Sequence, residues 1–289
     1  MTDLLLLNVS NGLIIGAFYV LMALGLSLIL NLSGVINFAH GGFLALGGYL
    51  AYTLAPYVGF WMALFLSPLL VAVLGLIVER TMMHHMYRRD PLYSLLLTFG
   101  LAFIFEDSTR AIWGASGKPF SVPAYLANPV SSKLFFLTHY RLLIVVIATL
   151  VVGALFLALR YTREGIRIRA GTLDLDTVSS LGVNVRRLRT FNFALGTYLA
   201  GLAGVLAAGQ IGVEPTMGAG LLMPSFVAII VGGVGSLPGT LLGGLLIGVA
   251  AGVTTVFWPA ASEAVIYVMM ALVLLVRPRG LLGEEGLLS

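Results

Sequence analysis

Few polar residues in this 289-residue chain could do chemistry, and the most unusual group lies inside an apolar run. Asn37 and His40 stand in Asn-Phe-Ala-His and are followed at once by Gly41 and Gly42. If this stretch is helical, the i,i+3 spacing puts Asn37 and His40 on one face. Polar groups inside a membrane are costly unless they face protein or water. Two hypotheses stay open: the four residues line a substrate pathway, or they mark a helix break satisfied by hydrogen bonds between helices.

A second group, Glu106, Asp107 and Arg110, has the spacing of ion pairs along a helix. Arg110 follows Glu106 by four residues and Asp107 by three, so these side chains can meet. We expect a structural ion pair toward the outer end of the helix, with a role at the pore entrance as the alternative. Carriers coupled to protons or sodium usually place acidic residues near the bilayer midplane. Only Glu214, in an irregular segment, is ambiguous in this respect.

Catalytic and nucleotide-binding motifs are missing from the sequence. Neither Lys118 nor Lys133 stands in a G-x-x-x-x-G-K-[ST] phosphate loop, so any ATP hydrolysis requires another chain. His84 and His85 are adjacent and do not face one site as i,i+4 ligands would, and the chain has no cysteine. His40 has no obvious partner for nucleophilic catalysis. We therefore expect no catalytic residue, no metal site and no cofactor.

The composition is that of a membrane protein. Hydrophobic residues make up 59% of the chain and charged residues 10%, whereas soluble domains carry about 25% charged residues. A soluble fold could not cover this much apolar chain, so the bilayer has to be the solvent. The net charge of +4 comes from basic residues in a few loops, which argues against nucleic acid as a partner. The N-terminus lacks a basic region, so we expect the first span to act as the insertion signal.

A spanning helix needs about 20 apolar residues, and nine segments approach that length. We predict an all-α polytopic membrane protein with about eight or nine transmembrane helices, forming one permease domain over 1–289. Two stretches, near 36–55 and 210–236, contain glycine or proline residues that predict broken or re-entrant helices. The predicted spans are 12–31, 36–55, 60–78, 92–113, 141–160, 191–209, 221–236, 240–257 and 262–276.

Basic residues predict the orientation. The stretches 79–91, 160–190 and 277–289 hold three, seven and two of them, together 12 of the 16 in the chain. The positive-inside rule puts all three stretches in the cytoplasm. Residues 114–140 and the N-terminus are then outside, although a re-entrant segment would reverse the side of the N-terminus.

Glycines recur every fourth residue at Gly244, Gly248 and Gly252. Small residues at this spacing let another helix backbone approach closely. The groove could serve packing within the chain or an interface between subunits.

The loop 161–190 is long for so compact a chain, and its centre predicts a short amphipathic helix. Such an element can dock a cytosolic partner, or it can lie on anionic lipid. We interpret it as an ATPase-coupling loop, whose candidate residues are Asp174, Asp176, Val178, Leu181 and Gly182.

Four stretches, in order along nearly the whole chain, resemble the LivH-type permease of bacterial high-affinity branched-chain amino-acid ABC transporters. His40 resembles the residue found at this position in LivH-type permeases rather than the one in their LivM-type partner subunits. One departure concerns the coupling loop, where the family commonly has a carboxylate at the position of Leu173; the neighbouring Asp174 matches. The stretches are Gly34-Val-Ile-Asn-Phe-Ala-His-Gly, residues 169–204, Val231-Gly-Gly-Val-Gly-Ser-Leu-Pro-Gly and Arg277-Pro-Arg-Gly-Leu-Leu-Gly.

The resemblance implies a multi-pass protein of the bacterial inner membrane that is not itself an enzyme. It would form the translocation pathway with a LivM-like permease subunit, driven by two cytosolic ATP-binding subunits and supplied by an external substrate-binding protein. The implied function is ATP-driven import of branched-chain amino acids. Permeases for other amino acids, urea or short amides belong to the same family and stay open. A secondary transporter or channel that works without ATPases is the alternative from another class.

Overall fold

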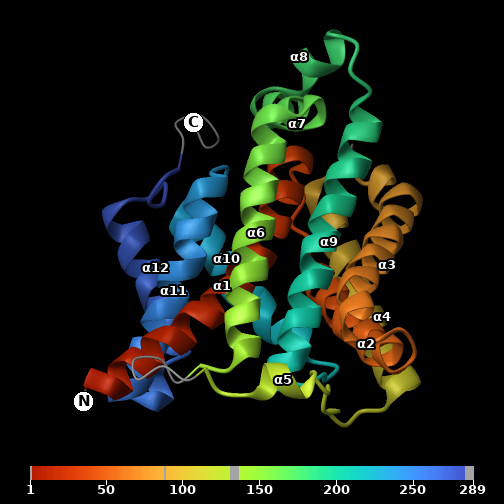
Figure 1. The fold of residues 1–289 in the computed structure, drawn as a ribbon. Coiled ribbons are helices and arrows are strands. Elements are labelled where there is room, and N and C mark those ends of the chain that lie inside the picture. Colours follow the sequence, from red (N-terminus) through yellow and green to blue (C-terminus); the bar gives the residue numbers. More distant parts are fainter. Residues whose placement is uncertain (1, 88, 131–136, 284–289) are drawn as a thin grey trace.

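The computed structural model describes residues 2–87, 89–130 and 137–283 as a bundle of α-helices (Figure 1). Within these residues the extended pairings are two isolated bridges, and no sheet forms. The helices are α1 (Thr2–Ser33), α2 (His40–Val58), α3 (Phe60–Thr81), α4 (Pro91–Trp113), α5 (Ala124–Ala127), α6 (His139–Tyr161), α7 (Arg163–Leu173), α8 (Leu175–Ser180), α9 (Val185–Ile211), α10 (Met217–Gly232), α11 (Leu237–Phe257) and α12 (Ala264–Val276), with 3-10 turns at Met83–His85 and Pro259–Ala261.

Each of the nine predicted spans corresponds to a helix, which confirms the all-α membrane class. Five helices (α1, α3, α6, α9 and α11) are long and apolar enough to cross a bilayer, and α10 and α12 are shorter apolar helices. The two stretches expected to be irregular are interrupted, because residues 34–39 and residues 212–216 are not helical. The helix α7 was not predicted as a separate element.

Glycines set the distances between the central helices. A Cβ atom at Gly248 of α11 would lie 2.5 Å from the Gly16 backbone of α1, and one at Gly252 would lie 2.3 Å from the Asn8 carbonyl oxygen. A Cβ atom at Gly204 of α9 would lie 1.9 Å from the Leu44 carbonyl oxygen of α2. Side chains cannot fit in these contacts, so the glycine stripe of α11 serves packing within the chain.

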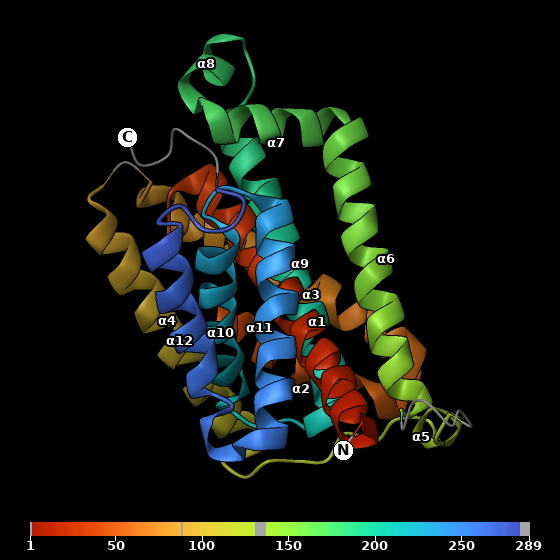
Figure 2. The ribbon, with the colours of Figure 1, turned by 90° about the vertical axis from the view of Figure 1, so that its left-hand side faces the viewer.

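The basic stretches gather at one end of the bundle, as the sequence predicts. The last turn of α3, the helices α7 and α8, the start of α9 and the end of α12 lie at the upper end in Figures 1 and 2, whereas α5 lies at the lower end. We call the end that carries α7 and α8 the α8 end. Its assignment to the cytoplasm rests on the positive-inside rule.

Single cysteines in this cysteine-free chain test the orientation. Ser116 and Ser179 are exposed at opposite ends of the bundle. We expect an impermeant thiol reagent to label Ser116→Cys in intact cells, and to label Ser179→Cys only after permeabilisation. The reverse pattern would put the α8 end outside.

Candidate translocation site and coupling loop

Asn37 and His40 lie in the protein interior, and each has no exposed surface. Asn37 is in the turn before α2, where its carbonyl oxygen accepts a hydrogen bond from the His40 amide at 3.2 Å. The expectation that both residues share one face of a helix is therefore wrong, because α2 begins only at His40. Among the described residues, neither polar side-chain atom of Asn37 has a hydrogen-bond partner, whereas the His40 ring meets the backbone of Met22.

The His40 ring fits beside a glycine of α1. A Cβ atom at Gly25 would lie 3.0 Å from His40 Nε2 and 2.6 Å from the Gly196 carbonyl oxygen of α9. Gly25 therefore leaves room for the imidazole and for the backbone of α9 at the same level. His40 lies where α2 meets this contact between α1 and α9.

Gly41 and Gly42 line a cavity of about 170 Å³ between α2, α4 and α10, which we call the Gly41 cavity. Asn37 and His40 do not line it, so the structure brings two of the four predicted pathway residues to this cavity. The neighbouring helices approach closely here, since a Cβ atom at Gly41 would lie 2.7 Å from the Gly218 carbonyl oxygen. The other walls are mostly apolar: Phe38, Ala45, Phe99, Ala102, Phe103, Pro215, Ala219, Leu222 and Met223.

Sequence reasoning missed these apolar lining residues because large aromatic side chains on a spanning helix carry no signal that separates a cavity wall from a lipid face. Phe38 contacts Phe99 edge to face, with ring centroids 5.9 Å apart, and Phe226 at 5.5 Å. The ring of Phe38 thus joins α4 to α10 beside the Gly41 cavity.

Glu106 is the acidic residue of the Gly41 cavity wall. Its carboxylate forms an ion pair with Arg110, which also lies 3.7 Å from the Asp107 carboxylate. The predicted pairing is thus present in the structure. Since the same carboxylate borders the cavity, the structural role and the role at a pore entrance are compatible.

The loop 161–190 contains the predicted short helix, α8, which projects beyond the bundle (Figures 1 and 2). Asp174 caps it by accepting hydrogen bonds from the Asp176 and Thr177 amides, both at 3.0 Å. The hydroxyl and amide of Thr177 hold the pKa of the Asp174 carboxyl below its ordinary value, so the ionised form is the cap. Gly182 ends the turn with φ +83°, a conformation that favours glycine.

Val178 and Leu181 do not share an exposed face, which corrects the amphipathic pattern inferred for this loop. Val178 is 5% exposed, whereas Leu181 is 78% exposed. The helix ends at Ser180, so Leu181 no longer follows the helical spacing. Leu173, directly before the cap, is 80% exposed and provides the second apolar side chain at this surface. Asp176 is also exposed.

The family model described as "Branched-chain amino acid transport system / permease component" matches residues 8–274. The chain belongs to this family. The permease is 31% identical to the high-affinity branched-chain amino acid transport system permease protein BraD of Pseudomonas aeruginosa, over 95% of this chain and 94% of BraD. It is 29% identical to LivH of Salmonella typhimurium over the same shares. It also matches LivM of Escherichia coli, at 28% identity over 91% of this chain and 67% of LivM.

Filling the Gly41 cavity tests whether it belongs to the translocation pathway of the permease. Ala219 lies in its wall and is exposed, so Ala219→Trp can occupy the space without disturbing the buried core. We expect transport per assembled complex to fall by about tenfold or more, because a side chain of this size takes up most of the cavity. Val268→Trp, on an exposed position of α12, is the control and should transport normally. Equal transport by both variants would exclude the cavity from the pathway.

Proposed function

We propose that the permease is one of two membrane subunits of an ATP-driven importer of branched-chain amino acids in the bacterial inner membrane. The observation that carries this proposal is the family match over residues 8–274, supported by relatives named BraD and LivH at about the same length. The similarity to LivM supports a second, homologous permease as the partner.

Two cytosolic ATP-binding subunits supply the energy in this proposal, and an external binding protein delivers the substrate. The sequence has no phosphate loop of its own. Leu173 and Leu181 offer exposed apolar side chains on the element that projects farthest from the bundle. A closing ATPase pair would push on α8, and the push would reach α9 through the short connection at Gly182–Asn184.

The start of α9 is fixed by hydrogen bonds that would transmit such a movement. Asn184 caps the helix by accepting a hydrogen bond from the Arg187 amide at 3.0 Å. One turn later, Thr190 donates to the buried Glu79 carboxylate of α3 at 2.6 Å. The start of α9 and the end of α3 are thereby tied together, so movement of one carries the other.

The pathway in this proposal passes the Gly41 cavity. Its aromatic and aliphatic walls suit a branched aliphatic side chain, and Gly41 and Gly42 let the substrate approach the backbone. Asn37 and His40 lie outside the lining and are proposed to position the break before α2. A rise in accessibility of either residue during the transport cycle would bring all four predicted residues to the pathway.

Transport by the assembled complex tests the function. We expect affinity purification of the permease to recover a second permease and ATP-binding subunits. Liposomes holding this complex, with the binding protein outside, should accumulate labelled leucine, isoleucine or valine only when ATP is enclosed, on the side of the α8 end. Accumulation of urea or short amides instead would assign another substrate of the family. Uptake by the permease alone would indicate a secondary transporter or channel.

The coupling surface has its own test. Leu173→Asp combined with Leu181→Asp should abolish co-purification of the ATP-binding subunits while membrane insertion stays normal, because both side chains are exposed. Ser179→Asp adds charge to the same exposed element without removing an apolar contact, and it should retain at least half of the subunits. Unchanged association of the double variant would move the docking surface elsewhere. Val178→Asp would be uninformative, since Val178 is buried.

A further inference from the structure

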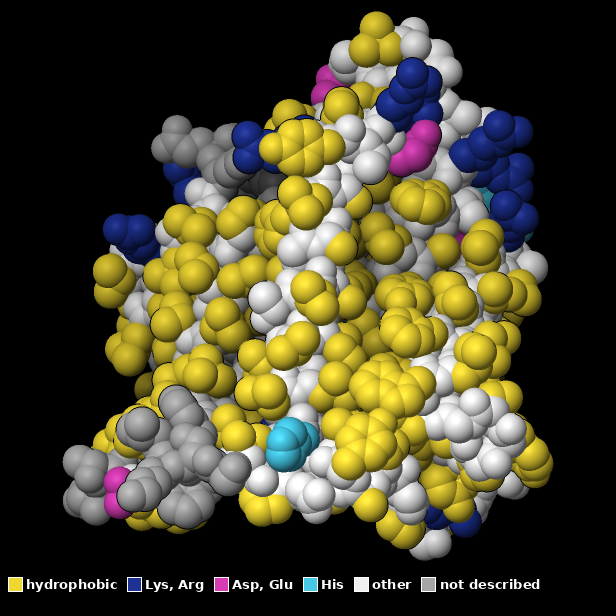
Figure 3. Space-filling model, in the orientation of Figure 1, with side chains coloured by type: hydrophobic (Ala, Val, Ile, Leu, Met, Phe, Trp, Pro, Cys, Tyr) yellow, Lys and Arg dark blue, Asp and Glu magenta, His cyan; other side chains and the backbone are white. Residues whose placement is uncertain are grey.

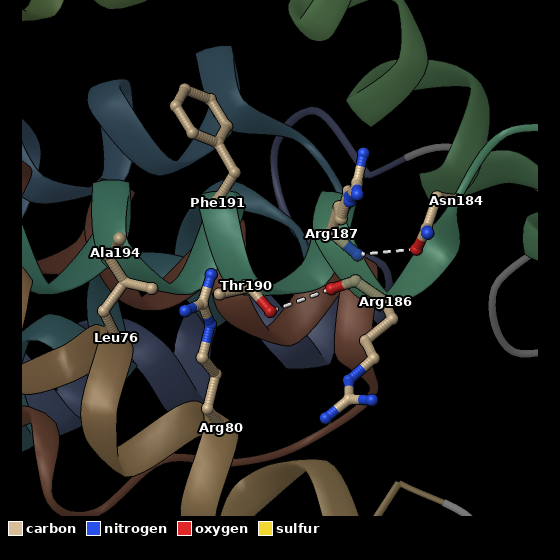
Figure 4. A pocket seen from close by; sticks show the side chains of 8 residues that line it. All are labelled: Leu76, Arg80, Asn184, Arg186, Arg187, Thr190, Phe191 and Ala194. Atoms are coloured by element: carbon tan, nitrogen blue, oxygen red, sulfur yellow. Dashed lines mark hydrogen bonds between the residues drawn. The ribbon is translucent and has the colours of Figure 1, made fainter.

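A cavity of about 550 Å³ lies between α3 and α9 at the α8 end, remote from the Gly41 cavity. We call it the α3–α9 cavity. Figure 4 shows Leu76 and Arg80 projecting from α3 toward α9, whereas Arg187 and Phe191 project from the side of α9 that faces away from α3 in this view. Arg186, the residue before Arg187, projects on the side of α9 nearer to α3 and also borders the cavity.

The cavity carries unbalanced positive charge. Arg80, Arg186 and Arg187 line it, no acidic residue does, and all three are exposed. Among the described residues, none of these guanidinium groups forms an ion pair with a carboxylate. Glu79, next to Arg80, is turned into the core, where its carboxylate accepts the hydrogen bond from Thr190. Because the Glu79 side chain is buried, its carboxylate does not face the cavity. Among the described residues, the three arginines therefore have no carboxylate partner there.

Both α3 and α9 place an arginine nearer the α8 end and an apolar side chain one turn deeper in the bundle. Leu76 lies four residues before Arg80 on α3, and Phe191 lies four residues after Arg187 on α9. In each helix an arginine therefore stands about one turn, roughly 5.4 Å, from an apolar side chain on the same face. The predicted spans end at 78 and begin at 191, so the arginines stand on the water side of the membrane boundary and the apolar residues on the lipid side.

The apolar part of the cavity continues onto a lipid-facing surface. Leu69, Val73 and Ile77 follow one side of α3 and are each 53% exposed, and Phe191 is 50% exposed. Figure 3 shows the same arrangement, with Lys and Arg side chains gathered at the upper right above a broad field of hydrophobic side chains.

We propose that the α3–α9 cavity binds an anionic phospholipid of the leaflet at the α8 end. Arg80 and Arg187 hold the phosphate, since guanidinium groups bind phosphate oxygens in pairs of hydrogen bonds. An acyl chain runs along Leu76, Phe191 and Ala194. Basic pockets between membrane helices at this depth suit anionic headgroups. An acidic protein surface would match the arginines but not the apolar wall that continues below the membrane boundary.

Native mass spectrometry of the purified complex tests the proposal, with phosphatidylglycerol and phosphatidylcholine titrated separately. Wild type should bind phosphatidylglycerol more tightly. Arg80→Gln combined with Arg187→Gln should weaken that binding by about tenfold or more, with phosphatidylcholine binding unchanged. Arg160→Gln combined with Arg163→Gln removes the same charge at the same end, outside the cavity, and should change binding by less than about twofold.

Two further arms identify the ligand. Phe191→Ser should also weaken phosphatidylglycerol binding, and inorganic phosphate should not displace the lipid, because the acyl chain contributes to binding. Equal phosphatidylglycerol binding by wild type and the Arg80/Arg187 variant would overturn the proposal. So would loss of ATP-binding subunits from that variant with its lipid binding intact, which would assign the arginines to a protein interface. These titrations measure lipid binding rather than transport, so their outcome is independent of whether the complex imports amino acids.

Discussion

Close contact between helix backbones is the constraint on which the rest of this structure depends. Apolar side chains gain little by leaving lipid for protein, so membrane helices associate through tight packing and hydrogen bonds. Here α1 meets α11 at Gly12 and Gly248 and meets α9 at Gly25 and Gly196, where a single Cβ atom would overlap backbone oxygen. The same contacts leave no free space around His40, which is why a polar residue in a predicted pathway is sealed in the core.

The α8 end is held by polar contacts as well as by close glycine contacts such as Gly232 with Gly239. Glu79 is fully buried and accepts from Thr190, while the Arg189 guanidinium lies 4.5 Å above the Tyr87 ring. Buried ion and hydrogen-bond partners are costly to separate, so these contacts join α3, the segment at Tyr87 and α9 into one unit. The loop that carries α8 leads directly into that unit. A rigid joint at this point is what a mechanical connection between an ATPase and a pore requires.

The sequence predicts the helices well and the side-chain surroundings less well. Apolar runs located all nine long segments, and the Asp174 to Gly182 stretch predicted α8, because both signals are local in the chain. The position of the break before α2 was harder to predict, because Asn37 and His40 have a helical spacing that the backbone does not follow. Burial was also hidden: Val178 is buried and Leu173 is exposed because of how α8 packs against α7 and α9, a tertiary arrangement that no local pattern specifies.

The loop that carries α8, the α3–α9 cavity and the contact beside His40 meet on one helix, α9. Its start follows α8 and borders the α3–α9 cavity, and its middle packs against α1 beside His40 through Gly196. A ligand wedged between α3 and α9 would act on the same joint that Glu79 and Thr190 hold. An anionic lipid there would stabilise the spacing of α3 and α9 at which Arg80 and Arg187 can both reach one phosphate. Because a ligand shifts an equilibrium only through its different affinity for the two states, such a lipid would influence transport only if that spacing changes during the cycle.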